Sequence, residues 1–378
     1  MKKIVGIIGT AAMLASSIFA VDFAARVYMN ADVAAGDKDH VEFFNLKKSN
    51  QKDADALVLS ANTDNAGAQF QFWYEYVGGE EAALKVRHTS LWFKPLDMLK
   101  ITVGDLDVGT YSEKLHYWKA PIANEYSQWY NGYSSAAVVS GAGFLCELTP
   151  IDGLWISLGT AAGTDSSTIA LTWADGVPDD NKFWCGAWGA GAKYDLNGLA
   201  GIPLSVGVSW RDNGKDDWKV LAIGADYGVL YGEGLYAMLN GRLRFNEGDN
   251  GKLDGITIDN FVKFAAGAFK AEVRAPVTIR LADNDPSWLV WSAKVSYALD
   301  GFTPYLMLAN DLDNKGAYLL SDAFGDSFGM QIKPGVSFSV GTCSIDAAVK
   351  LDVLSKIDNN SDKLGFKFAV PVELSVAF

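Results

Sequence analysis

Cysteine and histidine are both scarce in this chain of 378 residues, with three of each. Cys146, Cys185 and Cys343 are far apart and form no C-x-x-C pair. A disulfide framework or a zinc site is therefore not expected, and the cysteines are interpreted as small apolar fillers on strands. No metal site and no cofactor are predicted.

Long apolar runs are also missing after residue 20, although 49% of the residues are hydrophobic. A membrane-spanning helix needs ~20 consecutive apolar residues, so helical spans are excluded. Two classes remain. One is a soluble exported protein, and the other is a β-barrel, which crosses a bilayer in strands of ~9–11 residues that are only half apolar.

Basic residues are in the minority, since 32 Lys and Arg stand against 45 Asp and Glu, which gives a net charge of −13. Without Lys2 and Lys3 the net charge becomes −15. Nucleic acid is not expected as a partner, because its recognition needs basic surface to neutralise phosphates. His40, His88 and His116 are part of no H-E-x-x-H motif. No catalytic residue is predicted, and the chain is not expected to be an enzyme.

The first twenty residues differ from the rest of the chain. Lys2 and Lys3 precede an apolar run over residues 4–15, and small residues follow up to Ala20. This order is typical of a secretory signal peptide. The sequence therefore predicts a signal peptide over residues 1–20 and a single mature domain over residues 21–378.

The last segment, residues 363–378, is apolar at every second position and ends in Phe378. Period-two alternation places one set of side chains on each face of a strand. A strand of a soluble protein usually has ~5–6 residues, whereas this segment is long enough to cross a membrane at a tilt. The segment resembles the C-terminal strand of bacterial outer-membrane barrels. That resemblance implies recognition of Phe378 by the barrel-assembly machinery and contact with outer-membrane lipid.

The same alternation recurs upstream, and Arg and Lys lie on the polar face. Exposing such a side chain at the bilayer midplane costs ~2–4 kcal/mol, so the polar face must line a wet interior. The alternating segments are residues 204–211, 235–245, 269–281, 327–340 and 344–353.

Short and long connections alternate along the chain, as in barrels with tight periplasmic turns and longer outer loops. The sequence thus predicts an all-β fold, a transmembrane antiparallel up-and-down β-barrel of about 18 strands, with about 16 as the alternative. The alternative arises in two places: the alternation drifts over residues 256–267, and residues 166–173 fit either a strand extension or a loop. The short connections are residues 63–66, 94–97, 149–153, 195–203, 228–233, 300–301 and 341–342, with a further tight join near Gly267.

The sequence ITVGDLD at residues 101–107 ends the fifth expected strand and precedes a loop over residues 108–133. This arrangement is similar to general bacterial porins, and the resemblance implies a loop that folds into the barrel and a possible homo-oligomer. Glu113 and Glu125 of the loop would then face bases on the wall and create a transverse field. The alternative for each base is a structural ion pair. The bases are Arg26, Arg87, Lys100, Arg242, Arg244, Arg274 and Arg280.

Aromatic residues in the same loop, Tyr117, Trp118, Trp129 and Tyr130, either stack on sugars or anchor the loop to the wall. The function predicted from the sequence is an outer-membrane porin, a water-filled channel for passive diffusion of small hydrophilic solutes or ions. The alternatives are a sugar-selective channel, an adhesin or antigen displayed on a barrel, and a soluble secreted lectin.

Overall fold

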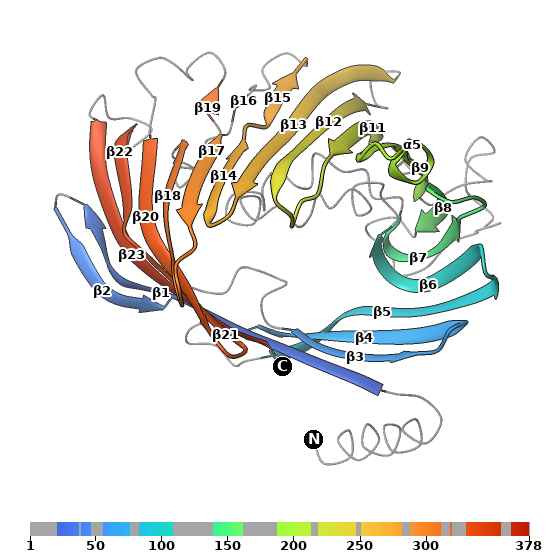
Figure 1. Ribbon diagram of the computed structural model, residues 1–378, viewed down its shortest axis with the longest axis horizontal. Helices are drawn as coiled ribbons and strands as arrows, with labels where there is room; N and C mark the ends of the chain where they lie inside the picture. Colours follow the sequence, from blue (N-terminus) through green and yellow to red (C-terminus); the bar gives the residue numbers. More distant parts are fainter. Residues whose placement is uncertain are drawn as a thin grey trace, which may run out of the picture.

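The computed structural model describes residues 21–37, 39–46, 56–75, 83–108, 139–161, 187–212, 218–246, 251–281, 288–289, 291–310, 318–319, 330–356 and 364–377. They form one antiparallel sheet that curves into a ring, which Figure 1 shows from one end of the barrel. β1 (Val21–Asp37) closes the ring by pairing with β23 (Leu364–Ala377) from Arg26↔Ala377 to Asp37↔Lys367. Closure removes the exposed sheet edges that an open sheet of this length would leave.

The described residues contain 23 strand segments, which make up 18 barrel strands, because five of the barrel strands consist of two segments each. For example, β2 and β3 both pair with β1, one near each end of it. The other two-segment strands are β14 with β15, β16 with β17, β18 with β19, and β21 with β22. The predicted barrel of 18 strands is therefore confirmed over the described part of the chain.

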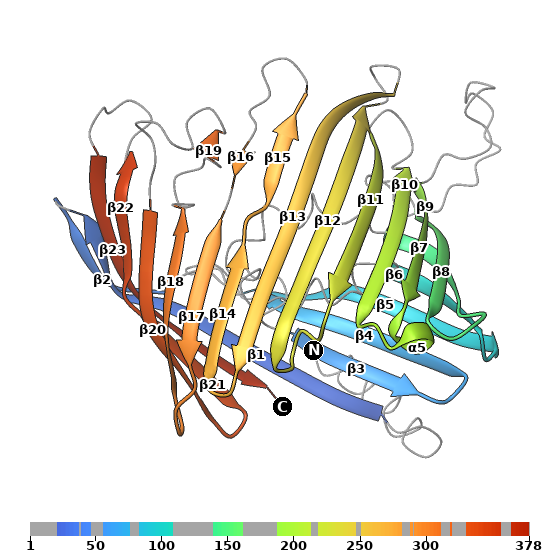
Figure 2. The same ribbon diagram turned by 45° about the horizontal axis from the view of Figure 1, so that its top comes forward.

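The segments between β1 and β23 follow one another around the ring, and neighbouring strands are tilted in the same direction (Figure 2). Their bounds are β2 Val41–Leu46, β3 Ala56–Asn62, β4 Ala66–Glu75, β5 Ala83–Leu96, β6 Leu99–Val108, β7 Val139–Leu148, β8 Leu154–Ala161, β9 Ala187–Asp195, β10 Leu204–Asp212, β11 Trp218–Tyr227, β12 Gly234–Asn246, β13 Lys252–Ala266, β14 Phe269–Arg274, β15 Val277–Arg280, β16 Trp288–Leu289, β17 Ser292–Tyr297, β18 Thr303–Asn310, β19 Tyr318–Leu319, β20 Met330–Val340, β21 Cys343–Ala348 and β22 Lys350–Lys356.

The eight short connections expected from the sequence all join strands at the same end of the barrel, which the rule for barrel topology makes the periplasmic end. We call it the short-turn end. The connection over residues 195–203 carries the helix α5 (Asn197–Ala200). No helix among the described residues is long and apolar enough to cross a membrane. At the other end β1 extends to Asp37 and β2 begins at Val41.

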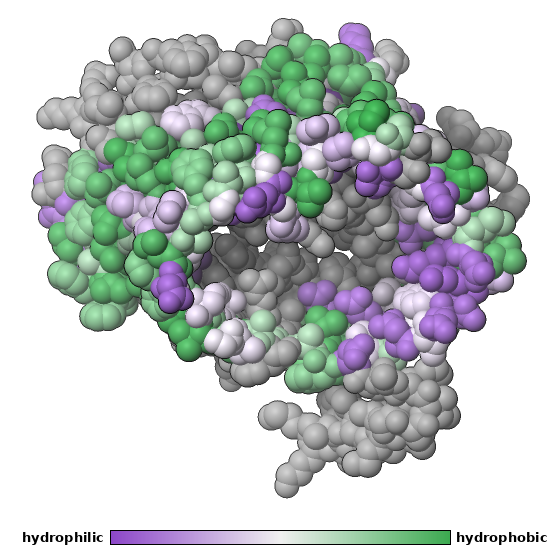
Figure 3. All heavy atoms as spheres, in the orientation of Figure 1, coloured by the Kyte–Doolittle hydropathy of each residue, from purple (hydrophilic) through white to green (hydrophobic). Residues whose placement is uncertain are grey.

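Burial in the barrel wall is inverted relative to a soluble protein, because apolar side chains are exposed and polar ones are buried. On β13, Ile258 and Val262 point outward and are more than 40% exposed, whereas Asp259 and Lys263 point inward and are almost fully buried. Figure 3 shows hydrophobic residues over much of the outer side of the ring, around a central hollow. An apolar belt of this kind is stable only against lipid.

β13 explains the drift in the alternation over residues 256–267. It is one continuous strand, but two of its residues lie on the face opposite to the one that their chemistry suggests. Phe261 points inward and is fully buried with Leu230, Tyr236 and Met238. Asn260 points outward with Ile258 and Val262. Phe261 packs in this buried cluster, and Asn260 forms hydrogen bonds with the neighbouring strand. β13 can therefore continue through both positions without a break.

Candidate pore wall

The inner wall of the barrel has a packed part and an accessible part. From β8 to β20 most inward side chains are buried, including Ser157, Ser209, Arg242, Arg274 and Gln331. From β3 to β6 most inward side chains are half-buried or exposed, although Thr102 on β6 is buried. The half-buried or exposed ones include the polar residues Ser60, Asn62, Gln69, Gln71, Ser90, Trp92, Lys94 and Lys100. Water and solutes therefore reach the wall at β3–β6 most easily.

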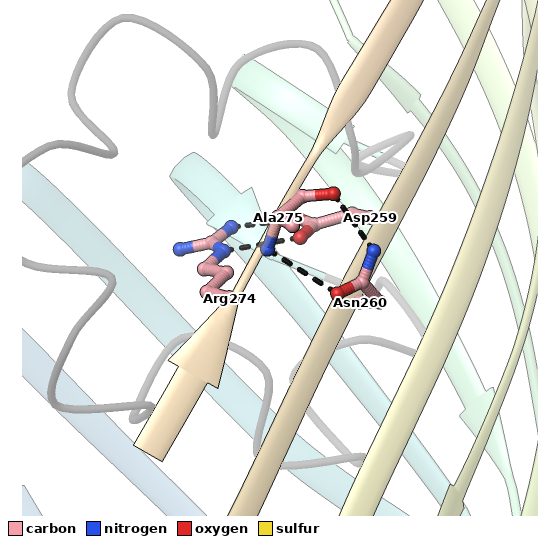
Figure 4. Close-up of polar contacts among 4 residues, drawn as sticks. All are labelled: Asp259, Asn260, Arg274 and Ala275. Atoms are coloured by element: carbon pink, nitrogen blue, oxygen red, sulfur yellow. Dashed lines mark hydrogen bonds and ion pairs between the residues drawn. The ribbon is translucent and has the colours of Figure 1, made fainter. Parts of the chain in front are cut away.

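Two arginines of the packed part form bidentate pairs with aspartates on the adjacent strand β13. Arg274 donates from Nε to Asp259 Oδ1 over 3.0 Å and from Nη2 to Asp259 Oδ2 over 2.6 Å (Figure 4). Arg244 donates to both carboxylate oxygens of Asp254 over 2.8 and 2.5 Å. The fork of the guanidinium matches the two oxygens, which makes these the strong form of ion pair.

Beside the first of these pairs, the outward Asn260 bridges an interruption in the neighbouring strand. Residues 275 and 276 belong to neither β14 nor β15, because Pro276 has no N–H to donate to a ladder. The Asn260 side chain donates to the Ala275 carbonyl over 2.7 Å and accepts from the Ala275 N–H over 3.2 Å (Figure 4). A side chain thus supplies the hydrogen bonds that the sheet lacks at this point.

Lys263 holds the connection over residues 228–233 inside the short-turn end of the barrel. Its ammonium donates to the carbonyls of Val229, Leu230 and Gly232, with N···O distances of 3.3 Å to Val229 and 2.7 Å to Gly232. Leu230 is buried against the inward side chains of β12 and β13. The turn therefore folds into the lumen and narrows this side of it.

Replacing Lys263 by methionine is expected to release this turn, because three carbonyl acceptors lose their donor. Hydrogen bonds of this kind contribute about 1.5–3 kcal/mol when a charged donor is involved. Hydrogen–deuterium exchange should become faster in peptides that cover residues 228–234 and stay unchanged at the turn over residues 267–268. Equal protection of residues 228–234 in both proteins would show that Lys263 does not hold the turn.

Of the bases predicted to line the pore, four have side chains that the structure describes, and all four point inward. Arg242, Arg244 and Arg274 lie in the packed part of the wall, two of them in the pairs above. Lys100 lies in the accessible part, 3.5 Å from Glu147 across the ladder. The side chains of Arg26, Arg87 and Arg280, on β1, β5 and β15, lie outside the described residues, as do Glu113, Glu125, Tyr117, Trp118, Trp129, Tyr130, Phe378 and residues 1–20.

Four residues of the inner wall were not predicted from the sequence to line the pore: Asp254, Asp259, Trp92 and Lys94. The two aspartates lie in or next to the segment where the alternation drifts. The alternation therefore did not show that their side chains point inward. Trp92 and Lys94 alternate with the outward Leu91 and Phe93, a signal that could have placed both on the inner face. Arg–Asp pairing across a ladder depends on register, which alternation alone does not give.

No group of three or more potential metal ligands occurs among the described residues. The described cysteines, Cys146 and Cys343, are free, on strands and half-buried, as expected for fillers, while Cys185 lies outside the described part. The motif G-x-S-x-G occurs at residues 325–329, also outside it, and all three histidines precede the motif. Hydrolases that use this motif carry the catalytic histidine after the serine.

No protein-family model matches the chain, and no curated protein matches it in sequence. Solved structures match it over nearly their whole length. The outer membrane protein OpdK of Pseudomonas aeruginosa has a TM-score of 0.56 at 10% identity, covering 95% of this chain and 98% of that one. OpdL of the same species gives 0.54 at 12%, with 96% and 99% covered. A BenF-like porin of Pseudomonas fluorescens Pf-5 gives 0.52 at 10%, with 96% and 99% covered.

These matches and the inverted burial of the wall define the class of the fold. The chain has the transmembrane β-barrel fold of bacterial outer-membrane porins, with 18 strands in its described part.

Proposed function

We propose that the protein is a porin of the bacterial outer membrane, through which small hydrophilic solutes and ions diffuse passively. The observation that carries this proposal is the accessible polar wall along β3–β6 inside a barrel with an apolar exterior. Barrels of 16–18 strands leave an aqueous channel, whereas those of eight strands are filled by side chains. The solute path would run along β3–β6, since the opposite side of the wall, which carries Arg242 and Arg274, is packed.

Two of the similar structures contain a small carboxylate. One is OpdK with vanillate, and the other is OccK2 of Pseudomonas aeruginosa in complex with glucuronate. Solutes of this size and polarity fit the proposed function of the present chain. A sugar-selective channel and a barrel that displays adhesive loops remain the alternatives, and flux through the barrel separates the second from a porin.

We also propose that the loop over residues 108–133 acts in the same channel. Glu113 and Glu125 would narrow the lumen and oppose the bases of the wall, while Tyr117, Trp118, Trp129 and Tyr130 would contact sugars or the wall. The C-terminal strand β23 with Phe378 would be recognised by the barrel-assembly machinery, and assembly into a homo-oligomer would follow the porin pattern. Residues 1–20 would direct export.

Single-channel recording of the purified protein in a planar lipid bilayer tests the proposed function. Stable, voltage-independent steps of ion current are expected at low voltage. The conductance should rise in proportion to salt concentration, because the current through a water-filled pore is carried by the dissolved ions. A folded barrel, identified by heat-modifiable migration, that conducts no ions would contradict the proposal and favour a display role.

A further inference from the structure

Four aromatic side chains point into the barrel near the short-turn end, and each donates a hydrogen bond to another strand. The acceptor is on the adjacent strand for Trp155 and Tyr236, and on the next strand but one for Trp92 and Tyr305. Trp155 Nε1 donates to Glu147 over 3.0 Å, the Tyr236 hydroxyl to Asp226 over 3.2 Å, and the Tyr305 hydroxyl to Asp346 over 2.6 Å. The fourth, Trp92, donates from Nε1 to Asn62 Oδ1 over 3.3 Å. These bonds fix the orientation of each ring.

Burial separates Trp92 from the other three. Trp155, Tyr236 and Tyr305 are 6%, 1% and 7% exposed, so their rings are part of the packed wall. Trp92 is only half-buried and lies on the accessible wall between β4 and β6. It is the one of these four rings that a solute in the lumen can reach.

A glycine on β4 makes room for the Trp92 ring. Gly67 is its cross-strand partner, and a Cβ atom added to Gly67 would lie 2.4 Å from Trp92 Nε1 and 2.6 Å from Cε2. The Asn62 oxygen lies 2.4 Å from the same position. The indole is therefore laid against the backbone of the wall, where it cannot close over the lumen, and its position is set by Gly67 and Asn62.

Two lysines flank this ring. The Nζ atoms of Lys94 and Lys100 are 5.7 and 5.4 Å from the centre of the Trp92 ring, within the ~6 Å at which a cation interacts with an aromatic face. Lys100 is also 3.5 Å from Glu147, whereas Lys94 is exposed and has no carboxylate within ion-pair distance among the described residues. The accessible part of the wall thus combines a fixed aromatic surface with a cation whose charge is not neutralised by the described wall.

We propose that Trp92, Lys94 and Lys100 form a solute-binding subsite at the short-turn mouth of the channel, for a small carboxylate that also carries a flat or apolar ring. The carboxylate binds the Lys94 ammonium, with Lys100 as the second cation, and the ring of the solute packs against Trp92. A ring stacked on an aromatic side chain adds about 0.5–1.5 kcal/mol beyond area burial, and the ammonium selects the charge. This subsite rests on the proposed channel function and adds a place of binding to it.

The subsite has a physical role in diffusion. A solute that binds weakly where the channel opens is concentrated at that mouth, and it still leaves within the time that passive flux needs. Because Lys94 lies next to the short turn over residues 97–98, the subsite would capture solutes entering from, or leaving toward, the periplasmic side.

The test is block of single-channel current by benzoate in planar bilayers, with acetate and benzamide as comparison probes. Benzoate carries both the charge and the ring, acetate only the charge, and benzamide only the ring. Each probe is added to each chamber in turn. Benzoate is expected to cause short, concentration-dependent interruptions of the current, most often from the chamber that the short turns face, and the other two probes much fewer.

Trp92→Leu and Lys94→Gln are expected to raise the apparent dissociation constant of benzoate about threefold to tenfold, since one stacking or charge contact is lost in each. Lys219→Gln is the matched control. Lys219 is paired with Asp212 at the opposite end of the barrel and on the outer face, so its loss removes one charge without touching the subsite. Block by benzoate should be unchanged in this control.

Heat-modifiable migration of each variant shows whether it is folded, and the exposed Lys94 provides a variant that should fold even if Trp92→Leu does not. Equal benzoate block in the wild type and in folded Lys94→Gln would overturn the subsite while leaving the channel function intact. Acetate that blocks as well as benzoate would overturn the role of Trp92. Absence of any ion current in the wild type would instead contradict the channel itself.

Discussion

Replacing Asp259 by asparagine should destabilise the barrel by about 3–5 kcal/mol, because the change leaves the Arg274 guanidinium buried without its countercharge. The two side chains are 1% and 5% exposed, and two aligned hydrogen bonds join them. The midpoint of urea unfolding in detergent, or the temperature at which the folded band on a gel converts to the unfolded one, measures the loss.

Two comparison variants decide what such a loss means. Asp212→Asn breaks the more exposed pair of Asp212 with Lys219, whose atoms are 3.5 Å apart, and should change stability by less than about 1 kcal/mol. Asp259→Leu combined with Arg274→Met removes both charges and should recover most of the stability, since apolar replacements of buried pairs are often neutral. If Asp259→Asn is as mild as Asp212→Asn, water reaches the pair and the wall there is open rather than packed.

The outer face of the barrel could be predicted from the sequence almost completely. Most lipid-facing positions are apolar, so alternation marks them without any knowledge of the neighbouring strand. The C-terminal segment illustrates this, because its apolar set lies on one face of β23 and the strand spans Leu364–Ala377, within one residue of the range expected. The short turns could be predicted for the same reason, since each one interrupts the alternation.

The inner face could be predicted only in part. Its side chains must be polar or small, but which of them pair depends on the register of two strands, and alternation does not determine register. Arg244 and Arg274 were recognised as inward bases, whereas Asp254 and Asp259, their partners, were not. Lys94 was assigned to the short connection over residues 94–97, although it is still within β5 and on the lumen side of the wall.

Asn260→Leu is the second change for which a large loss of stability is expected, and here the sign of the change in stability is informative. Asn260 points outward between Ile258 and Val262, so a simple count of apolar surface says that leucine should stabilise a lipid-facing position. The hydrogen bonds predict the opposite. Without the amide, the N–H and the carbonyl of Ala275 lose the partner that Asn260 supplies, in a medium that offers no water to replace it.

The net loss for Asn260→Leu should be about 2–4 kcal/mol, since each unsatisfied backbone group in lipid costs several kcal/mol and the leucine offsets part of it. Val262→Leu, two residues along on the same face of β13, changes no polar partner and should be neutral. Urea unfolding in lipid vesicles measures both. A more stable Asn260→Leu protein would mean that the interruption at Pro276 is satisfied without this side chain, whereas the expected loss would establish that an amide in the lipid-facing wall holds β14 and β15 together as one barrel strand.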